Sequence, residues 1–237
     1  SLLASMSKRS KLPSSKHKTY RMKKIEFTEK MKEERTILIP QMAPIHFELF
    51  EAAFLSEGYK VKLLRECSQH TVEVGLKYVN NDACYPSILV TGQMIEALES
   101  GKYDLDKTAL IMSQTGGGCR ATNYIGFIRK ALKDAGFENI PVISFNIVGM
   151  EKMPGFKITV PLMEKLLKMV VYGDLLQKML TKNRAYEVHK GETQELFDKW
   201  MNKCKELLSR KSSNKEFKQS IYDIVNDFEK IELDTST

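Results

Sequence analysis

Three of the four cysteines in this sequence lie between predicted strands and helices, where a thiol can take part in chemistry. Cys67 follows a predicted strand, Cys84 stands two residues before Pro86 at a predicted helix start, and Cys119 follows three glycines. Free N–H groups and the dipole at a helix N-terminus stabilise a thiolate. Thiolates that converge beside glycines are what an iron–sulfur cluster requires. We therefore take Cys67, Cys84 and Cys119 as candidate metal ligands, with ordinary buried thiols as the alternative.

The spacing of the cysteines excludes several familiar sites. Cys67, Cys84 and Cys119 are separated by 16 and 34 residues, so there is no compact ferredoxin-type motif. No C-x-x-C pair occurs, which removes thioredoxin-like chemistry and the usual zinc-ribbon spacing. Cys204 falls on an apolar helical stripe, and we expect it to pack in the core.

Two other chemistries overlap Cys119. Residues 116–121 match the dinucleotide pattern G-x-G-x-x-A, but they follow the third predicted strand, and Asn146 rather than an acidic residue ends the next one. The same stretch resembles a nucleophile elbow with Cys119 as the thiol, for which His46 or His70 could supply the base. No sequence feature ties either histidine to Cys119, so both alternatives stay open.

The elements that must position these residues alternate between strand and helix. Apolar runs predict strands at residues 36–40, 59–64, 108–112 and 141–145. Helical periodicity predicts helices at about 45–56, 72–79, 86–100 and 125–135. Strands joined by helices of this length require parallel pairing with right-handed crossovers. The sequence therefore predicts an α/β fold, a Rossmann-like doubly wound parallel sheet of about four strands, whose ligands bind beyond the carboxyl ends of the strands.

From Pro161 onward the pattern becomes wholly helical. Three apolar stripes follow one another: Leu162, Leu166, Met169 and Val170; Phe197, Trp200, Cys204 and Leu207; and Phe217, Ile221, Ile224 and Phe228. We therefore divide the chain into a basic flexible tail or linker at 1–24, the α/β domain at 25–158, and an all-helical C-terminal extension at 159–232.

The charge of the 237-residue chain is concentrated in the tail. Eight of its 37 basic residues and none of its 30 acidic ones lie in residues 1–24, which leaves 29 basic against 30 acidic residues elsewhere. This does not support a nucleic-acid role for the folded part. The tail itself fits a solvated linker or a docking strip for an acidic neighbour or RNA.

The chain shows no apolar run of membrane-span length and no signal-peptide pattern, so we expect a soluble cytoplasmic protein without a membrane partner. It starts at Ser1 rather than Met, from which we expect a processed tag or a fragment of a larger protein.

Two longer motifs resemble a known family. Residues 75–86 (GLKYVNNDACYP) and 114–124 (QTGGGCRATNY) closely resemble the 2-hydroxyacyl-CoA dehydratase family, specifically the dehydratase-like C-terminal portion of large proteins fused to CoA-enzyme activase domains. The likeness continues through residues 44–47 and 100–103 and covers about residues 27–190.

The resemblance implies a [4Fe–4S] cluster held by cysteines and low-potential electron transfer driven by ATP hydrolysis in an activase. The resemblance implies Cys84 and Cys119 as ligands. A ligand role for Cys67 is inferred from sheet geometry alone. The remaining ligands would come from Cys67, from a preceding domain or from a non-protein group. The partners implied are an activase-type ATPase domain or subunit, an acyl-CoA and a second copy of the chain.

Our first hypothesis is therefore an iron–sulfur redox module that is not catalytic alone, because a complete dehydratase has a larger architecture. In this hypothesis Gly116, Gly117 and Gly118 offer N–H groups to the cluster. Arg120, Asn123 and His46 would line the site. The alternatives are a structural or docking domain of a larger activase-fused protein and a Cys119 thiol acyl-transfer enzyme.

Overall fold

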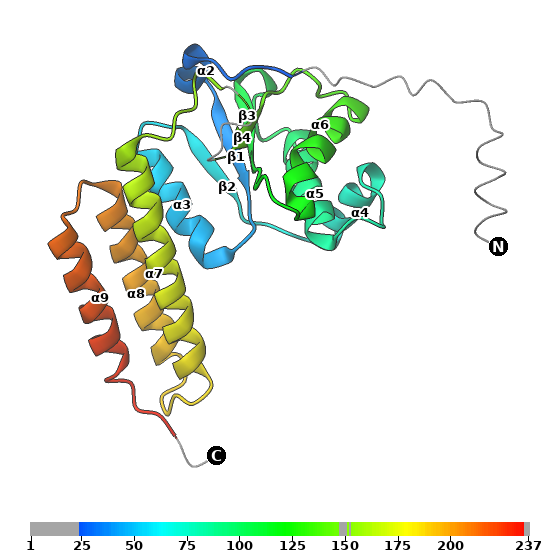
Figure 1. The fold of residues 1–237 in the computed structure, drawn as a ribbon. Coiled ribbons are helices and arrows are strands. Elements are labelled where there is room, and N and C mark those ends of the chain that lie inside the picture. The colour runs from blue at the N-terminus through cyan, green and yellow to red at the C-terminus, as the bar shows by residue number, and fades with distance from the viewer. Residues whose placement is uncertain (1–23, 147–150, 152, 235–237) are drawn as a thin grey trace, which may run out of the picture.

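The computed structural model describes residues 24–146, 151 and 153–234, and its centre is one sheet of four parallel strands (Figure 1). The strands are β1 (Thr36–Pro40), β2 (Val61–Leu64), β3 (Thr108–Ser113) and β4 (Val142–Phe145), in the order β2-β1-β3-β4. All three pairings are parallel, so every carboxyl end lies at the same edge. The predicted doubly wound α/β fold is confirmed.

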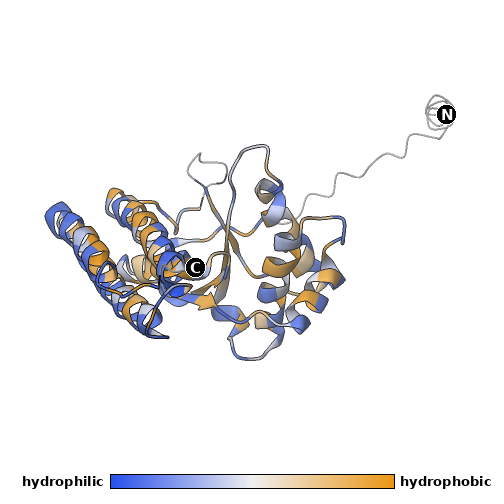
Figure 2. Ribbon diagram, turned by 90° about the horizontal axis from the view of Figure 1, so that it is seen from below, coloured by the Kyte–Doolittle hydropathy of each residue, from blue (hydrophilic) through white to orange (hydrophobic). Residues whose placement is uncertain are grey.

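Helices cover both faces of the sheet (Figures 1 and 2). One face carries α3 (Pro44–Ser56), and the other carries α4 (Gln69–Tyr78), α5 (Tyr85–Glu99) and α6 (Tyr124–Asp134). Strand residues alternate between the two faces. Ile37 and Ile39 pack in the core on the α3 side, whereas Leu38 packs with α5 and α6 on the other side.

The C-terminal part is helical, as predicted, and packs on α3 (Figure 1). It consists of α7 (Val160–Arg184), α8 (Glu192–Ser209) and α9 (Asn214–Phe228). Trp200 and Cys204 are buried there and belong to the same apolar cluster as the α3 side of the sheet. The prediction that Cys204 is a core residue is confirmed.

Sequence signals for helix ends account for most of the boundaries. Ser68 and Ser213 form capping boxes at the starts of α4 and α9, and Thr159 caps α7. Gly58, which ends the α3 region, has a φ of 78°, a left-handed conformation that glycine adopts without strain. Short 3₁₀ turns at Leu105–Lys107 and Arg120–Asn123 precede β3 and α6.

Three details differ from the predictions. Strand β2 begins at Val61 rather than Tyr59, because the Tyr59 backbone N–H donates to the Phe54 carbonyl at the end of α3 instead of to a neighbouring strand. A six-residue helix, α2 (Glu29–Glu34), was not predicted. Val170 is 44% exposed rather than part of the core.

Of the predicted tail, only Lys24 is among the described residues, where it pairs with Glu151. In the part of the chain that the structure describes, no helix is both long and apolar enough to cross a bilayer.

Candidate functional site

Two helix N-termini meet at the carboxyl edge of the sheet, on the face opposite α3. Helix α5 leads back toward β3, so its first residues lie at the carboxyl edge, where Cys84 is the N-cap. Helix α6 follows β3 and begins at the same edge with Tyr124. The two helices are packed against each other. The chain therefore brings two segments that are 40 residues apart to one place.

Cys84 and Tyr124 form the central contact of this site. The Cys84 Sγ lies 2.7 Å from the Tyr124 Oη, and Tyr124 is only 5% exposed. The hydrogen bond with Tyr124 is the main reason that the pKa of the Cys84 thiol is lowered, and contacts with Ser87 and the charge of Arg120 act in the same direction. Partial burial opposes them. The net effect favours the thiolate, the form that binds metals and attacks electrophiles.

The pKa of the Tyr124 hydroxyl is raised, chiefly by burial, and the charge of Cys119 is one of the further causes. Burial raises the pKa of Tyr124 to about 12, and the hydrogen bond with Cys84 and the charges of Cys84 and Cys119 add to the increase. Tyr124 therefore stays protonated at neutral pH, and its hydroxyl is the donor whenever Cys84 is a thiolate. Of the two cysteines, Cys84 contacts this buried hydroxyl directly, and Cys119 affects it through charge alone.

Arg120 links the loop of Cys119 to the loop of Cys84. Its guanidinium donates to the backbone carbonyl of Asp82 at 3.2 Å. Next to it, Cys119 caps the Arg120–Asn123 turn, where its Sγ accepts from the Ala121 N–H at 3.5 Å. The positive charge of Arg120 thus lies near Cys84, and both thiols stand at the N-terminus of a helical turn.

The three glycines leave open space beside Cys119. Gly116 has a φ of 72°, which favours glycine, whereas a Cβ on Gly117 or Gly118 would meet no other atom. The loop is held at its base, where the Thr122 hydroxyl donates to the Gly117 carbonyl at 3.0 Å. The protein's own packing does not require glycine at 117 and 118. Close approach of a bound group is a physical reason for their presence.

The donor set fits half of the ligands of an iron–sulfur cluster. Cys84 and Cys119 supply two sulfurs, and the glycine loop supplies backbone close to them. Within residues 24–146, 151 and 153–234, no three His, Cys, Asp or Glu side chains are grouped so that they could hold a metal ion. Cys67 is exposed and follows β2, the edge strand, so the structure does not join it to the other two as a ready three-cysteine site.

The structure places the other predicted site residues differently. His46 lies on α3, on the opposite face of the sheet, where its Nε2 is 3.0 Å from Asp174 and its ring lies against Gly173 of α7. Its ring is therefore used to join α3 to α7. Asn123 precedes α6 and forms no side-chain cap bond there.

The structure does not favour either of the two other motifs at Cys119, the dinucleotide pattern and the nucleophile elbow. The glycine loop leads into a four-residue 3₁₀ turn before α6, rather than directly into an α-helix as the dinucleotide motif requires. Neither candidate base of a nucleophile elbow is hydrogen-bonded to Cys119. His46 contacts Asp174, and His70 is exposed and lies 4.0 Å from Glu73.

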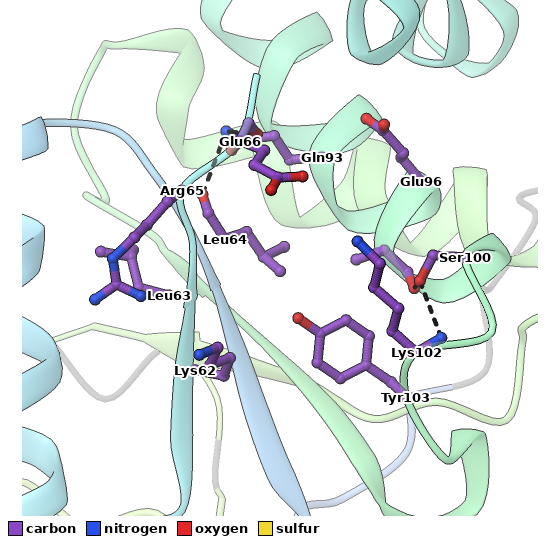
Figure 3. Close-up of a pocket in the computed structure, with 11 residues that line it drawn as sticks. Lys62, Leu63, Leu64, Arg65, Glu66, Gln93, Glu96, Ser100, Lys102 and Tyr103 are labelled. Carbon is purple, nitrogen blue, oxygen red and sulfur yellow. Dashed lines mark hydrogen bonds between the residues drawn. The ribbon is translucent and has the colours of Figure 1, made fainter. Parts of the chain in front are cut away.

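A separate pocket follows the free edge of β2 (Figure 3). It has a volume of about 350 Å³ and lies between β2, α5 and the segment around Lys102 and Tyr103. At its upper end Gln93 donates to the Glu66 carbonyl and accepts from the Gln41 N–H, which ties the ends of β1 and β2 together. No cysteine lines this pocket, so it is not part of the thiol site.

Sequence reasoning did not single out Tyr124 as a residue of the candidate site. Its only signal was its place at the end of the 114–124 motif, since a tyrosine at the start of an amphipathic helix has no special chemistry by itself. Searches of protein-family models, curated proteins and solved structures found no match to this chain.

Proposed function

We propose that the chain is an iron–sulfur redox module in which Cys84 and Cys119 are cluster ligands. The single observation that supports this best is that the loops of Cys84 and Cys119 are held together, with the Cys84 sulfur 2.7 Å from the Tyr124 hydroxyl and Arg120, next to Cys119, bonded to the Asp82 carbonyl. A bound [4Fe–4S] cluster would supply one-electron transfer at low potential. The close resemblance of residues 75–86 and 114–124 to the 2-hydroxyacyl-CoA dehydratase family supports the same function.

In this proposal each residue of the site has its own task. Cys84 and Cys119 hold iron through sulfur, Tyr124 donates a hydrogen bond to the Cys84 sulfur, and Gly117 and Gly118 leave their backbone accessible. Arg120 offsets negative charge and holds the two loops together through Asp82. Such contacts are the levers by which a protein adjusts the potential of a cluster.

The module is completed by a partner, since two thiols are fewer than a cluster needs. We propose an activase-type ATPase domain or subunit as the electron donor, in the cytoplasm, with the missing ligands contributed by a neighbouring domain or a non-protein group. An acyl-CoA is the acceptor that the resemblance suggests.

Anaerobic reconstitution with iron and sulfide tests the proposal. The chain should bind iron, turn brown and give the electron paramagnetic resonance signal of a reduced cluster. Cys84→Ser and Cys119→Ser should each remove most of the iron, whereas Cys204→Ala, with its thiol buried in the helical part, should keep it. Iron bound equally well by all four proteins would contradict the proposal.

Thiol chemistry is the second candidate, and the structure favours Cys84 for it rather than Cys119. The lowered pKa of Cys84 and the donor Tyr124 favour a reactive thiolate. A chain that binds no iron but hydrolyses a thioester with loss of activity on alkylation of Cys84 would support this candidate.

A further inference from the structure

An apolar pocket lies where the chain reverses its direction across the sheet. From β1 the chain moves outward to β2, and from β3 it moves outward to β4 on the other side, so the reversal falls between β1 and β3. The pocket lies at the carboxyl ends of β1, β3 and β4, between α3 and α7, and has a volume of about 290 Å³. In open α/β sheets this is the position at which ligands bind.

The walls of the pocket are almost entirely apolar. Nine of its ten lining residues are apolar, and the tenth is Ser113, the last residue of β3. Ala109 and Ile111 pack on the α3 side, so the alternation of the strand turns Ser113 to that side as well. Its hydroxyl has no hydrogen-bond partner among the described residues, and a bound molecule could use it.

The pocket is held open by packed rings. Phe50, which is 8% exposed, lies 4.3 Å from Phe54, 5.5 Å from Phe47 and 5.7 Å from Phe145, measured between ring centroids. Aromatic rings packed in this way have little freedom to collapse inward. The pocket is therefore formed before any ligand enters, as small-molecule sites usually are.

We propose that this pocket binds a small uncharged molecule, a short aliphatic chain or a single ring, with a hydroxyl or carbonyl group at Ser113. The volume equals roughly ten waters at about 30 Å³ each, which suits a ligand of about ten non-hydrogen atoms and excludes a nucleotide. None of the described residues that line the walls is charged, so among them a charged ligand would find no partner.

The position of Ser113 connects this pocket with the proposed redox site. The residues that follow it form the glycine loop that carries Cys119. A ligand whose polar end contacts Ser113 therefore has that end at the start of the loop. The inference that this ligand is the substrate of the redox module rests on the proposed function. The inference that the pocket binds such a ligand does not depend on it.

Nuclear magnetic resonance of the metal-free protein tests the inference, with benzyl alcohol as the probe and the methionine methyl groups labelled with ¹³C. Met42 and Met169 line the pocket, whereas Met201 is buried in the helical part. Benzyl alcohol should shift the Met42 and Met169 signals saturably and leave Met201 unchanged. Benzoate, which has the same ring and a charge, should bind at least tenfold more weakly.

Variants make the test specific. Ser113→Leu fills the pocket and should weaken binding at least tenfold, whereas Ser209→Leu, at the exposed end of α8, should not change it. Should Ser113→Leu fail to fold, Met42→Trp at the exposed rim narrows the same pocket, and Met169 remains as the reporter. Absent shifts, or shifts that neither pocket variant weakens, would overturn the inference. Because the protein is free of metal, that result would leave the cluster proposal intact, and Cys84→Ser should not alter the affinity for the probe.

Discussion

Gly92 of α5 lies directly against the carbonyl group of Thr71 on α4. A Cβ at position 92 would overlap that oxygen, and a Cβ at Gly75 would likewise overlap the carbonyl oxygen of Ile88. The backbones of the two helices therefore touch at two points. This close crossing fixes the start of α5, and with it the position of Cys84.

Gly92→Ala should destabilise the protein by about 2–3 kcal/mol, because the backbone of Thr71 must move to admit the new methyl group. Gly126→Ala is the matched control. Gly126 also lies within a helix, α6, but a Cβ there would meet nothing, so this change should stabilise the protein by about 0.5–1 kcal/mol. Denaturant unfolding of both variants measures the difference. Equal effects would mean that α4 and α5 are not in contact at this point.

The ion pair of Arg129 and Glu151 should make the protein sensitive to acid. Both side chains are 9% exposed, and Arg129 also donates to the carbonyl of Val142 on β4. The hydrogen bond with Arg129, helped by Lys24, holds the pKa of Glu151 below its ordinary value of 4.5. Its stabilisation is therefore complete above 4.5 and is lost as the pH falls through the lower pKa of the folded state.

Glu151→Gln tests this directly. The variant leaves Arg129 without its charged partner and should cost about 3 kcal/mol at neutral pH. Its free energy of unfolding should also depend less on pH below 4.5 than that of the wild type. Parallel pH profiles of the two proteins would show that this carboxylate is not paired in solution.

Tyr124→Phe should make Cys84 less reactive. Without the hydroxyl, the largest cause of the lowered pKa of the Cys84 thiol is gone, so less thiolate is present near neutral pH. The pH dependence of alkylation by iodoacetamide, in a background where the other three cysteines are replaced, measures this pKa. We expect the profile to move to higher pH, and an unchanged profile would exclude the contact.

Cys204→Ala should change the stability of the protein and leave the reactivity of Cys84 unaltered. Cys204 is fully buried, and burial raises the pKa of its thiol to about 12. The substitution leaves a small cavity beside Trp200 and should cost roughly 1 kcal/mol. Native Cys204 should resist alkylation until the protein unfolds. Fast labelling of Cys204 under native conditions would contradict the packing of this face of α8 in the core.

The sequence predicted the sheet well because its strands are short apolar runs with clear helix caps between them. It did not predict α2, whose six residues include no buried one and so leave no apolar stripe. It correctly placed His46 near the carboxyl edge of the sheet. A position after a strand end does not specify a face of the sheet, however, and His46 lies on the face that carries α3 and α7.

The positions of Cys84 and Cys119 in the candidate site could be predicted from the sequence, whereas the contact with Tyr124 could not. Cys84 and Cys119 could be placed because each precedes a helical turn that begins at the carboxyl edge. The contact with Tyr124 depends on how α5 and α6 pack across 40 residues of sequence, and local pattern does not encode that packing. The same holds for Arg120 and Asp82, whose hydrogen bond joins two separate loops.

The most direct test of the shared thiol site is a chemical cross-link in the metal-free protein. Dibromobimane becomes fluorescent when it joins two neighbouring thiols, and wild-type protein and the Cys67→Ser and Cys204→Ala variants should all form the fluorescent product. Cys84→Ser and Cys119→Ser should each abolish it, and peptide mapping should find the link between Cys84 and Cys119. A link that involves Cys67, or no link at all, would contradict the shared site.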